Sequence, residues 1–316
     1  MYYFIVNPAA KSGRGMQVWR QVHTELKNRD TEYRFYLTAK ERNASFLAKH
    51  LLKKVPGEVT IVALGGDGTV NEVLQGIAAA GAFERTRLGY IPAGSSNDLA
   101  RALELPQDPV EILERILDGD GERRIDLGRL YYRDAEDPEL NGRQRYFVVS
   151  AGIGFDAAVC AESLETKDKA FFNRIGLGAL SYGFLCVKRL LLSKGAEFQI
   201  TLDGKRIHAV QDSLFVAIMN HKYQGGGVMF APDAVDDDGE LDLCFTDRMS
   251  RFKVLMTLPK AYNGAHVGTP GIRQDKARKI RIVSDSPLYV HTDGEVQTKA
   301  TDISVRCLPK KLRLLV

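Results

Sequence analysis

The sequence predicts an α/β domain built on a parallel sheet, followed by a second domain that is rich in β-strands and organised as an antiparallel sandwich. Three observations favour this fold class. Strand and helix patterns alternate in the first part of the chain, apolar runs there end in glycine-rich turns, and strand patterns dominate after about residue 126. With 316 residues, 44% of them hydrophobic, the chain is long enough for two domains. We therefore expect a first domain over residues 1–126 and a second over residues 127–308.

In the first domain each predicted strand is followed by a predicted helix. The run VTIVALG (59–65) is apolar and rich in β-branched residues, which is typical of a strand buried on both faces of a parallel sheet. The crossovers between such strands should be right-handed. The other predicted strands are YYFIVNP (2–8), TEYRFYLT (31–38) and RLGYIPAG (87–94). The predicted helices are MQVWRQVHTELKNR (16–29), ERNASFLAKHLLKK (41–54), TVNEVLQGIAAAG (69–81) and SSNDLARALELP (95–106).

The second domain begins with a polar hairpin loop, YRDAEDPELNGRQRY (132–146), and continues mainly as strands. Two helical pieces interrupt these strands, at residues 171–192 and 250–262. The predicted strands cover 145–159, 197–210, 213–220, 240–246, 279–284, 287–296 and 301–308.

The segment FFNRIGLGALSYGFLCVKRLLL (171–192) is quite apolar. Arg174, Lys188 and Arg189 leave an uncharged run of about 13 residues, whereas a membrane span needs about 20. Two interpretations stay open: a helix buried in the core, and a helix that lines an apolar ligand site or touches a membrane surface.

The net charge of +4 is too small to indicate a nucleic-acid partner. Basic residues are frequent from Arg273 onward, which indicates either solvated strand faces or attraction to an anionic membrane. The four cysteines (Cys160, Cys186, Cys244 and Cys307) form no CxxC pair, so we expect reduced thiols in a cytosolic protein.

The turn Gly65–Thr69, with sequence GGDGT, joins a predicted buried strand to a predicted helix. Glycines there let a phosphate approach the backbone N–H groups, and the start of a helix adds a positive dipole end. A carboxylate at Asp67 fits such a site if Mg²⁺ lies between it and the phosphates. The alternative is a tight turn with an Asx cap, because the Asp-Gly pair is common in this chain.

Two other turns follow predicted strands in the same way. NPAAKSGRG (7–15) matches neither the dinucleotide fingerprint nor a Walker A sequence, and alone it is a weak phosphate loop. In IPAGSSNDLARAL (91–103), Gly94, Ser95 and Ser96 offer donors, and Asn97 or Asp98 could cap the helix. Because the carboxyl ends of parallel strands meet at one edge of a sheet, we expect the three loops to converge there.

Taken together, six blocks resemble the soluble diacylglycerol kinase family, which includes bacterial lipid kinases and the sphingosine and ceramide kinases. The resemblance covers nearly the whole chain. GGDGT alone is shared with NAD kinases, and the later blocks favour lipid kinases. In chain order the blocks are NPAAKSGRG (7–15), GGDGTVNEV (65–73), PAGSSNDLARAL (92–103), GIGFDAAV (152–159), DDDGELD (236–242) and HTDGEV (291–296).

The resemblance implies a nucleotide domain like that of NAD and diacylglycerol kinases, a β-rich lipid domain, and an active site between them. It also implies that residues 309–316 return to the first domain. The residues that match the family's nucleotide site are Asn7, Lys11, Gly13, Thr38, Gly66, Asp67, Gly68, Thr69, Asn71, Glu72, Ser95 and Asp98. The first loop has one residue more than the commoner spacing, so the contacts of Lys11–Gly15 stay open.

The resemblance further implies ATP and Mg²⁺ as cofactors, with Asp67 holding the metal and Glu295 as general base. As bare sequence, Glu295 could equally belong to a hairpin with an Asp-Gly turn. DDDGELD matches a structural Mg²⁺ site made by Asp238 and the carbonyls of Val235 and Glu240. Without the resemblance it is a polar turn before a strand.

The implied activity is phosphorylation of a lipid hydroxyl, most simply diacylglycerol to phosphatidic acid in phospholipid synthesis. The alternatives are a sphingoid base or ceramide, NAD as acceptor, and a nucleotide-binding regulator without turnover. We expect a cytoplasmic protein that visits the inner membrane face transiently through residues 171–192 and the basic tail, and the resemblance implies a homodimer. The loop NHKYQGGGVMFAP (220–232) is either a plain loop or a lid over the substrate.

Overall fold

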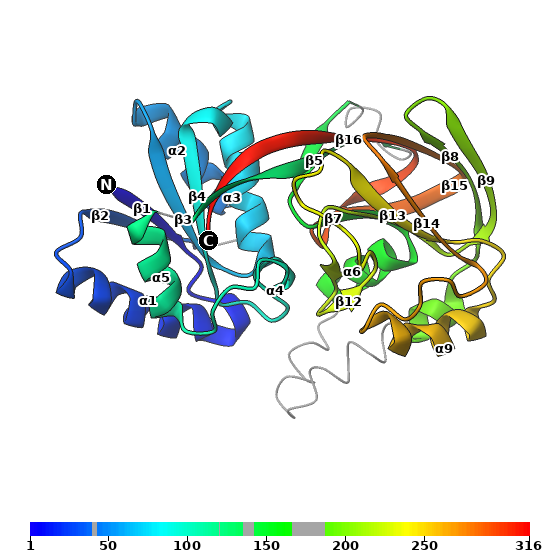
Figure 1. Ribbon diagram of the computed structural model, residues 1–316, viewed down its shortest axis with the longest axis horizontal. Coiled ribbons are helices and arrows are strands. Elements are labelled where there is room, and N and C mark those ends of the chain that lie inside the picture. The colour runs from blue at the N-terminus through cyan, green and yellow to red at the C-terminus, as the bar shows by residue number, and fades with distance from the viewer. Residues whose placement is uncertain (40–42, 120, 135–141, 166–186) are drawn as a thin grey trace.

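The computed structural model describes residues 1–316 except 40–42, 120, 135–141 and 166–186. Two domains lie side by side and are joined by two long strands (Figure 1). The predicted fold class is confirmed: a parallel α/β domain precedes a β-rich sandwich domain.

Four parallel strands form the sheet of the first domain, in the order β2-β1-β3-β4. They are β1 (Tyr2–Val6), β2 (Tyr33–Leu37), β3 (Val59–Gly65) and β4 (Thr86–Pro92). The helices are α1 (Ala10–Asn28), α2 (Asn43–Lys54), α3 (Asp67–Ala79), α4 (Asp98–Ala102) and α5 (Pro109–Asp118), with a 3₁₀ turn η1 (Phe83–Arg85).

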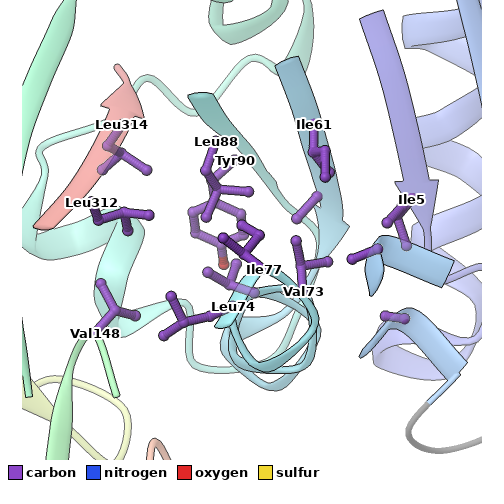
Figure 2. Packing of buried hydrophobic residues seen from close by; sticks show 14 of the residues in the cluster. Ile5, Ile61, Val73, Leu74, Ile77, Leu88, Tyr90, Val148, Leu312 and Leu314 are labelled. Atoms are coloured by element: carbon purple, nitrogen blue, oxygen red, sulfur yellow. The ribbon is translucent and has the colours of Figure 1, made fainter. Parts of the chain in front are cut away.

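The helices cover both faces of this sheet because its central strands are apolar throughout. Every residue of β3 is buried. Alternate residues point to opposite faces, so Ile61 packs towards α2 and α3, whereas Val62 packs towards α1 and α5. Figure 2 shows the first of these layers, in which Ile5, Leu88 and Tyr90 of the sheet meet Leu74 and Ile77 of α3.

Helix α5 was not predicted, although its sequence carries the usual end signals. The Asp108 carboxylate accepts the N–H of Val110 at 3.0 Å, Pro109 opens the helix, and Gly119 ends it with a left-handed φ of 71°. α5 closes the core on the α1 side of the sheet through Ile112, Leu113 and Ile116.

The second domain contains antiparallel strands that enclose a separate core. In the described part of this domain, helices form at α6 (Phe155–Glu165), at residues 187–192 and at α9 (Arg251–Ala261). The strands are β5 (Glu122–Asp134), β6 (Gln144–Phe147), β7 (Ser150–Gly154), β8 (Ala196–Leu202), β9 (Arg206–Ser213), β10 (Phe215–Met219), β11 (Tyr223–Gln224), β12 (Val228–Met229), β13 (Leu241–Thr246), β14 (Ile272–Ala277), β15 (Lys279–Thr292) and β16 (Glu295–Leu315).

One strand prediction was wrong. Residues 155–159 were expected to continue a strand, but they begin α6. Gly154 has φ of 110°, a conformation that favours glycine, and the N–H of Phe155 then donates to the carbonyl of Leu214. The chain therefore leaves the sheet at Gly154, and Asp156 lies in the first turn of a helix.

The predicted helical segment 171–192 lies mostly outside the described residues. Residues 187–192 of it are helical. Among the helices that the structure describes, none is long and apolar enough to cross a membrane.

Strands β5 and β16 run through both domains (Figure 1). β16 pairs with β15 in the second domain, and its residues Arg313–Leu315 pair in parallel with β4 of the first. The expected boundary at residue 126 falls inside β5. Because β16 starts at Glu295, directly after the turn Asp293-Gly294, the same strand that joins the domains also carries the hairpin tip.

Candidate active site

The loops after β1 and β3 leave the sheet at the point where the strand order reverses. The chain passes from β1 outward to β2, and then crosses to β3 and β4 on the other side. Ligands of open α/β sheets bind outside the carboxyl ends of strands at such a point. The Asn7 amide ties the two loops together, since Nδ2 donates to Oγ1 of Thr69 at 3.2 Å and Oδ1 accepts the N–H of Ala9 at 3.1 Å.

The first loop has an unusual backbone. Lys11, Ser12 and Gly13 have φ values of 44°, 56° and 98°, so three successive residues are left-handed. This conformation is costly for Lys11 and Ser12, and such strain persists mainly at functional sites. Gly15 lets the following helix approach closely, because a Cβ there would lie 2.0 Å from the Asn7 carbonyl oxygen. The loop therefore presents its main chain, with Lys11 and Ser12 exposed, at the sheet edge.

The GGDGT turn forms the start of α3, which begins at Asp67 rather than near Thr69. Gly66 lies against the loop after β4, since a Cβ on Gly94 would be only 2.5 Å from the Gly66 Cα. Ser95 lies exposed in that loop. The three loops thus meet at one edge of the sheet, and the glycines are needed because neighbouring main chains come into contact.

Asp67 caps a helix that belongs to another loop. Its carboxylate accepts the N–H of Asp98 at 2.8 Å and of Leu99 at 3.4 Å, at the start of α4, and the Tyr90 hydroxyl donates to it at 3.3 Å. Burial raises the pKa of the Asp67 carboxyl to about 6, against the effect of these N–H groups. The expected side-chain cap from Asn97 or Asp98 is wrong: Asn97 Oδ1 accepts the N–H of Gly94 instead, at 2.9 Å.

Asp98 connects the first domain to the glycine loop Gly225–Gly227 of the second. Its Oδ2 accepts the N–H of Gly226 at 2.9 Å, and Arg101 of α4 stacks over the Tyr223 ring with 5.7 Å between guanidinium carbon and ring centroid. Burial raises the pKa of the Asp98 carboxyl although these N–H groups favour its charge. Its other oxygen, Oδ1, is buried without a partner in the described part of the chain.

Glu295 reaches the first domain from the tip of the β15–β16 hairpin. A Cβ on Gly68 would lie 3.2 Å from Glu295 Oε1, so this carboxylate rests against the first turn of α3. Asp67 and Glu295, which are far apart in the sequence and come from different domains, therefore lie at the start of the same helix.

Asp293, which the sequence did not single out, fixes this hairpin. Its buried carboxylate accepts the N–H groups of Val148, Val149 and Ser150 at 2.9–3.0 Å, and Nδ2 of Asn71 donates to it at 2.7 Å. One side chain thus holds the hairpin, the segment before β7 and helix α3 together. The Asp-Gly pair signals the turn but not these partners.

Other predicted nucleotide-site residues have packing partners here. Asn71 is fully buried, and its amide also donates to the carbonyl of Tyr146 at 3.0 Å. Glu72 Oε2 accepts the N–H of Ala44 at 3.0 Å at the start of α2. Thr38 follows β2, and its N–H donates to the Val6 carbonyl. Asn71 and Glu72 therefore use their side chains to position elements around the loops.

The DDDGELD segment lies against β14 and the connecting strands. Asp238 Oδ1 accepts the N–H of Glu240 at 3.0 Å, and the Lys276 ammonium lies 3.1 Å from Asp238 Oδ2 and 3.6 Å from Asp242 Oδ1. Within the described ranges there is no group of three or more His, Cys, Asp or Glu side chains placed to hold a metal ion.

A buried polar cluster lies beside the hairpin on one face of the second-domain sheet. Asp156 Oδ2 lies 3.0 Å from His291 Nε2 and 3.4 Å from Gln224 Nε2. The N–H of Gly294 donates to His291 Nδ1 at 3.2 Å, which ties the cluster to the hairpin tip. Asp156 Oδ1 is buried without a partner among the described residues.

An apolar cavity opens farther along this face of the sheet. The strands place Cys244, Ala217, Gly152 and His291 in one row across the sheet, from the cavity to the polar cluster. A Cβ on Gly152 would collide with the carboxylate of Asp156. Glycine is therefore needed at the position where this row passes the polar cluster. The side chains that line the cavity include Phe155, Leu190, Phe215, Phe230, Leu258 and Ile272.

Comparison with known proteins adds a family to this geometry. Residues 1–130 match the model described as diacylglycerol kinase catalytic domain, and residues 148–316 match the model described as YegS C-terminal NAD kinase beta sandwich-like domain. The chain is 28% identical to proteins named diacylglycerol kinase from Mycobacterium tuberculosis (strain ATCC 25618 / H37Rv), over 92% of this chain and 87% of that protein, and from Staphylococcus aureus (strain MRSA252), over 92% and 84%.

A crystal structure of a diacylglycerol kinase from Bacillus anthracis str. Sterne has the same fold, with a TM-score of 0.68 at 20% identity over 99% of this chain and 96% of that one. The two family models together cover both domains and both halves of the site. The chain therefore belongs to the diacylglycerol kinase family of lipid kinases, and it is a phosphotransferase whose acceptor is an alcohol group.

Proposed function

We propose that the chain transfers the γ-phosphoryl group of ATP to the free hydroxyl of diacylglycerol, giving phosphatidic acid. The observation that carries this proposal is the meeting of Asp67 and Glu295, from two domains, at the first turn of α3. The acceptor is taken from the relatives, which are named diacylglycerol kinases.

The nucleotide would lie on the three converging loops. Main-chain N–H groups of such loops and the start of α3 suit the charge of a polyphosphate. Lys11 and Ser95 lie exposed in two of these loops. Phosphoryl transfer depends mainly on positioning and on neutralising charge, which such a backbone site provides.

Mg²⁺ would be held by Asp67, with Asp98 beside it. The unpartnered buried oxygen of Asp98 fits a nearby cation or a water bound to one, and both carboxylates have raised pKa values in the protein alone. When bound, the cation would supply charge neutralisation at the phosphates.

Glu295 would accept the proton of the attacking hydroxyl. It lies next to the start of α3, where the phosphates would be placed, and on the side of the second domain. A positioned base contributes about 10²–10⁴-fold to rate.

The acyl chain of the acceptor would enter the apolar cavity, which lies on the same sheet face as the hairpin. Its lining side chains are predominantly apolar, as in most small-molecule sites. The polar cluster of Asp156, Gln224 and His291 separates the apolar cavity from Glu295, as the polar and apolar parts of a lipid require.

A second, structural Mg²⁺ at Asp238 and the carbonyls of Val235 and Glu240 stays a separate proposal. Lys276 already neutralises Asp238 and Asp242, so a divalent ion there would have to displace its ammonium group. Chelation followed by thermal melting tests it. An unchanged melting temperature would leave Lys276 as the cation of this site.

In a cell this activity would return diacylglycerol to phospholipid synthesis, and the protein would work at the cytoplasmic face of the membrane. A homodimer is part of the same proposal and is tested by light scattering.

The activity is tested with labelled ATP and Mg²⁺ in parallel tubes containing diacylglycerol in mixed micelles, a sphingoid base or ceramide in mixed micelles, and NAD without detergent. Label in phosphatidic acid is the expected result. Label only in another lipid would keep the kinase and change the acceptor, and label only in the NAD tube would overturn the lipid assignment. ATP binding with no labelled product in any tube would favour a regulator without turnover.

A further inference from the structure

Helix α9 is apolar on two opposite sides. Val254 and Leu258 line the cavity on its inner side. On its outer side Phe252 and Met256, one turn apart, are 70% and 55% exposed. A surface helix normally carries one apolar stripe that faces the core. The packing of this domain therefore does not account for the exposed side chains of Phe252 and Met256.

The helical residues 187–192 extend this outer surface. Leu190 lines the same cavity as α9, whereas Leu191 and Leu192 are 58% and 66% exposed. The two helices are joined directly, because Nε of Arg251 donates to the carbonyl of Ser193 at 2.6 Å. Together they roof the cavity and expose four large apolar side chains.

The charged residues of the two segments that form this surface are all basic. Segments 187–195 and 248–272 contain seven lysines and arginines and no aspartate or glutamate. Glu162 of α6 pairs with Lys188 and Arg189, and Lys194, Lys253 and Lys260 are exposed. Exposed apolar side chains surrounded by basic ones are the pattern of helices that lie in the interface of anionic membranes.

The basic tail differs from this surface. At least five of its ten basic side chains form ion pairs, as Arg281 does with Asp302 and Arg313 with Glu122. It also lies on the strands β14 to β16, where no comparable group of exposed apolar side chains accompanies it in the described part of the chain.

We propose that α9 and residues 187–192 form a docking surface for an anionic lipid bilayer, with Leu191, Leu192, Phe252 and Met256 inserted among the acyl chains. The inference rests on the proposed function, because a lipid acceptor must be taken from a membrane. It adds that the cavity roof itself is the part that touches the bilayer, so a lipid enters the cavity from the membrane without crossing water. In Figure 1, α9 lies at the outer edge of the second domain, on the side away from the β5 and β16 connection.

The test compares wild type with Phe252→Ser/Met256→Ser in sedimentation with vesicles of phosphatidylcholine containing phosphatidylglycerol, without ATP or substrate. Binding should weaken by at least about tenfold in the double variant. Replacing Lys253 and Lys260 by Ala should weaken it by about fivefold per residue at low salt. The matched control is Phe46→Ser, which changes a phenylalanine of α2 in the first domain that is 61% exposed, and this variant should bind as wild type does.

A second readout separates this proposal from the proposed function. With a short-chain diacylglycerol dissolved below its aggregation limit, Phe252→Ser/Met256→Ser should keep wild-type turnover, whereas turnover on vesicle-borne diacylglycerol should fall. If neither wild type nor the double variant phosphorylates diacylglycerol, the proposed function fails. The vesicle-binding comparison still decides whether the docking surface exists. Unchanged vesicle binding in the double variant, or no binding by wild type, overturns the docking proposal. So does a shift from dimer to monomer in the variant with vesicle binding intact, which would assign this face to a second copy of the chain.

Discussion

The two domains contribute different kinds of group to the site. The first domain uses main chain: three glycine-containing loops, a strained backbone at Lys11 and Ser12, and a helix start. The second domain uses side chains: an apolar cavity and a buried polar cluster on a sheet face. A backbone site recognises charge and tolerates few changes, whereas a cavity recognises shape and is adjusted by any of its lining residues.

The largest effect is expected at the junction between these halves. Asp67→Ala should lower kcat by at least about 1,000-fold, because it removes the proposed metal ligand and also the cap of α4. Asp67→Asn keeps most of the shape and serves as control for folding. Activity near the wild-type level in both variants would remove Asp67 from the site.

Glu295→Gln should lower kcat by about 100-fold and leave ATP affinity within about twofold, because the base acts on the acceptor and not on the nucleotide. Gln297→Glu, two residues farther along the same strand, is the matched control. Measuring kcat and the Kd of ATP on the same variants checks that only kcat is lowered. Equal losses in both would mean that Glu295 belongs to the nucleotide half.

Asp293→Asn tests whether the hairpin must be held. An amide cannot accept hydrogen bonds on both ends as the carboxylate does from Val148, Val149 and Ser150. We expect kcat to fall by about tenfold or more with little change in KM for ATP, since Glu295 would lose its position. Asp293→Glu should not restore activity, because a longer side chain would move the carboxylate away from these three N–H groups. Wild-type kcat in Asp293→Asn would show that the hairpin holds itself.

Ala261→Phe tests the cavity of the second domain separately from the nucleotide loops of the first. The added ring would fill space next to Leu258 and raise KM for long-chain diacylglycerol by about tenfold, with ATP kinetics unchanged. A short-chain acceptor should be affected less. An equal effect on both acceptors would place the acyl chain elsewhere.

The smallest effect concerns stability. Burial holds the pKa of His221 at about 3, with a smaller effect of Arg123, so the folded protein resists protonation of this imidazole. Because the folded pKa lies below the unfolded value of 6.5, this residue lowers the free energy of unfolding as pH falls from about 6.5 towards 3.

His221→Gln should remove that part of the pH dependence, and urea unfolding at pH 7 and pH 5 measures it. His50→Gln, on the exposed surface of α2, is the control. The same pH dependence in all three proteins would show that the His221 ring is not desolvated in the folded protein.

The sequence predicts the first domain better than the second for the same reason that their sites differ. VTIVALG and the glycine turns are local patterns, and they predict the buried strand, the helix that follows it and the convergence of the loops directly. The cavity and the cluster of Asp156, Gln224 and His291 arise from strands that are distant in sequence, so no local pattern announces them.

Two errors have the same origin. The cap of α4 comes from Asp67, 31 residues earlier, although Asn97 stands at the local capping position. Residues 155–159 have strand-like composition, but the turn at Gly154 sends them out of the sheet. In both places a tertiary contact overrides the local preference.

The central claim is that Asp67 and Glu295 act at one site on one reaction. A double-mutant cycle in kcat tests it most directly, with Asp67→Asn, Glu295→Gln and the combined variant assayed on diacylglycerol in mixed micelles. The account predicts that the combined variant is about as slow as the slower single variant, because residues that act as a unit lose their contribution together. Losses that multiply would contradict it, since they would mean that the two carboxylates act independently.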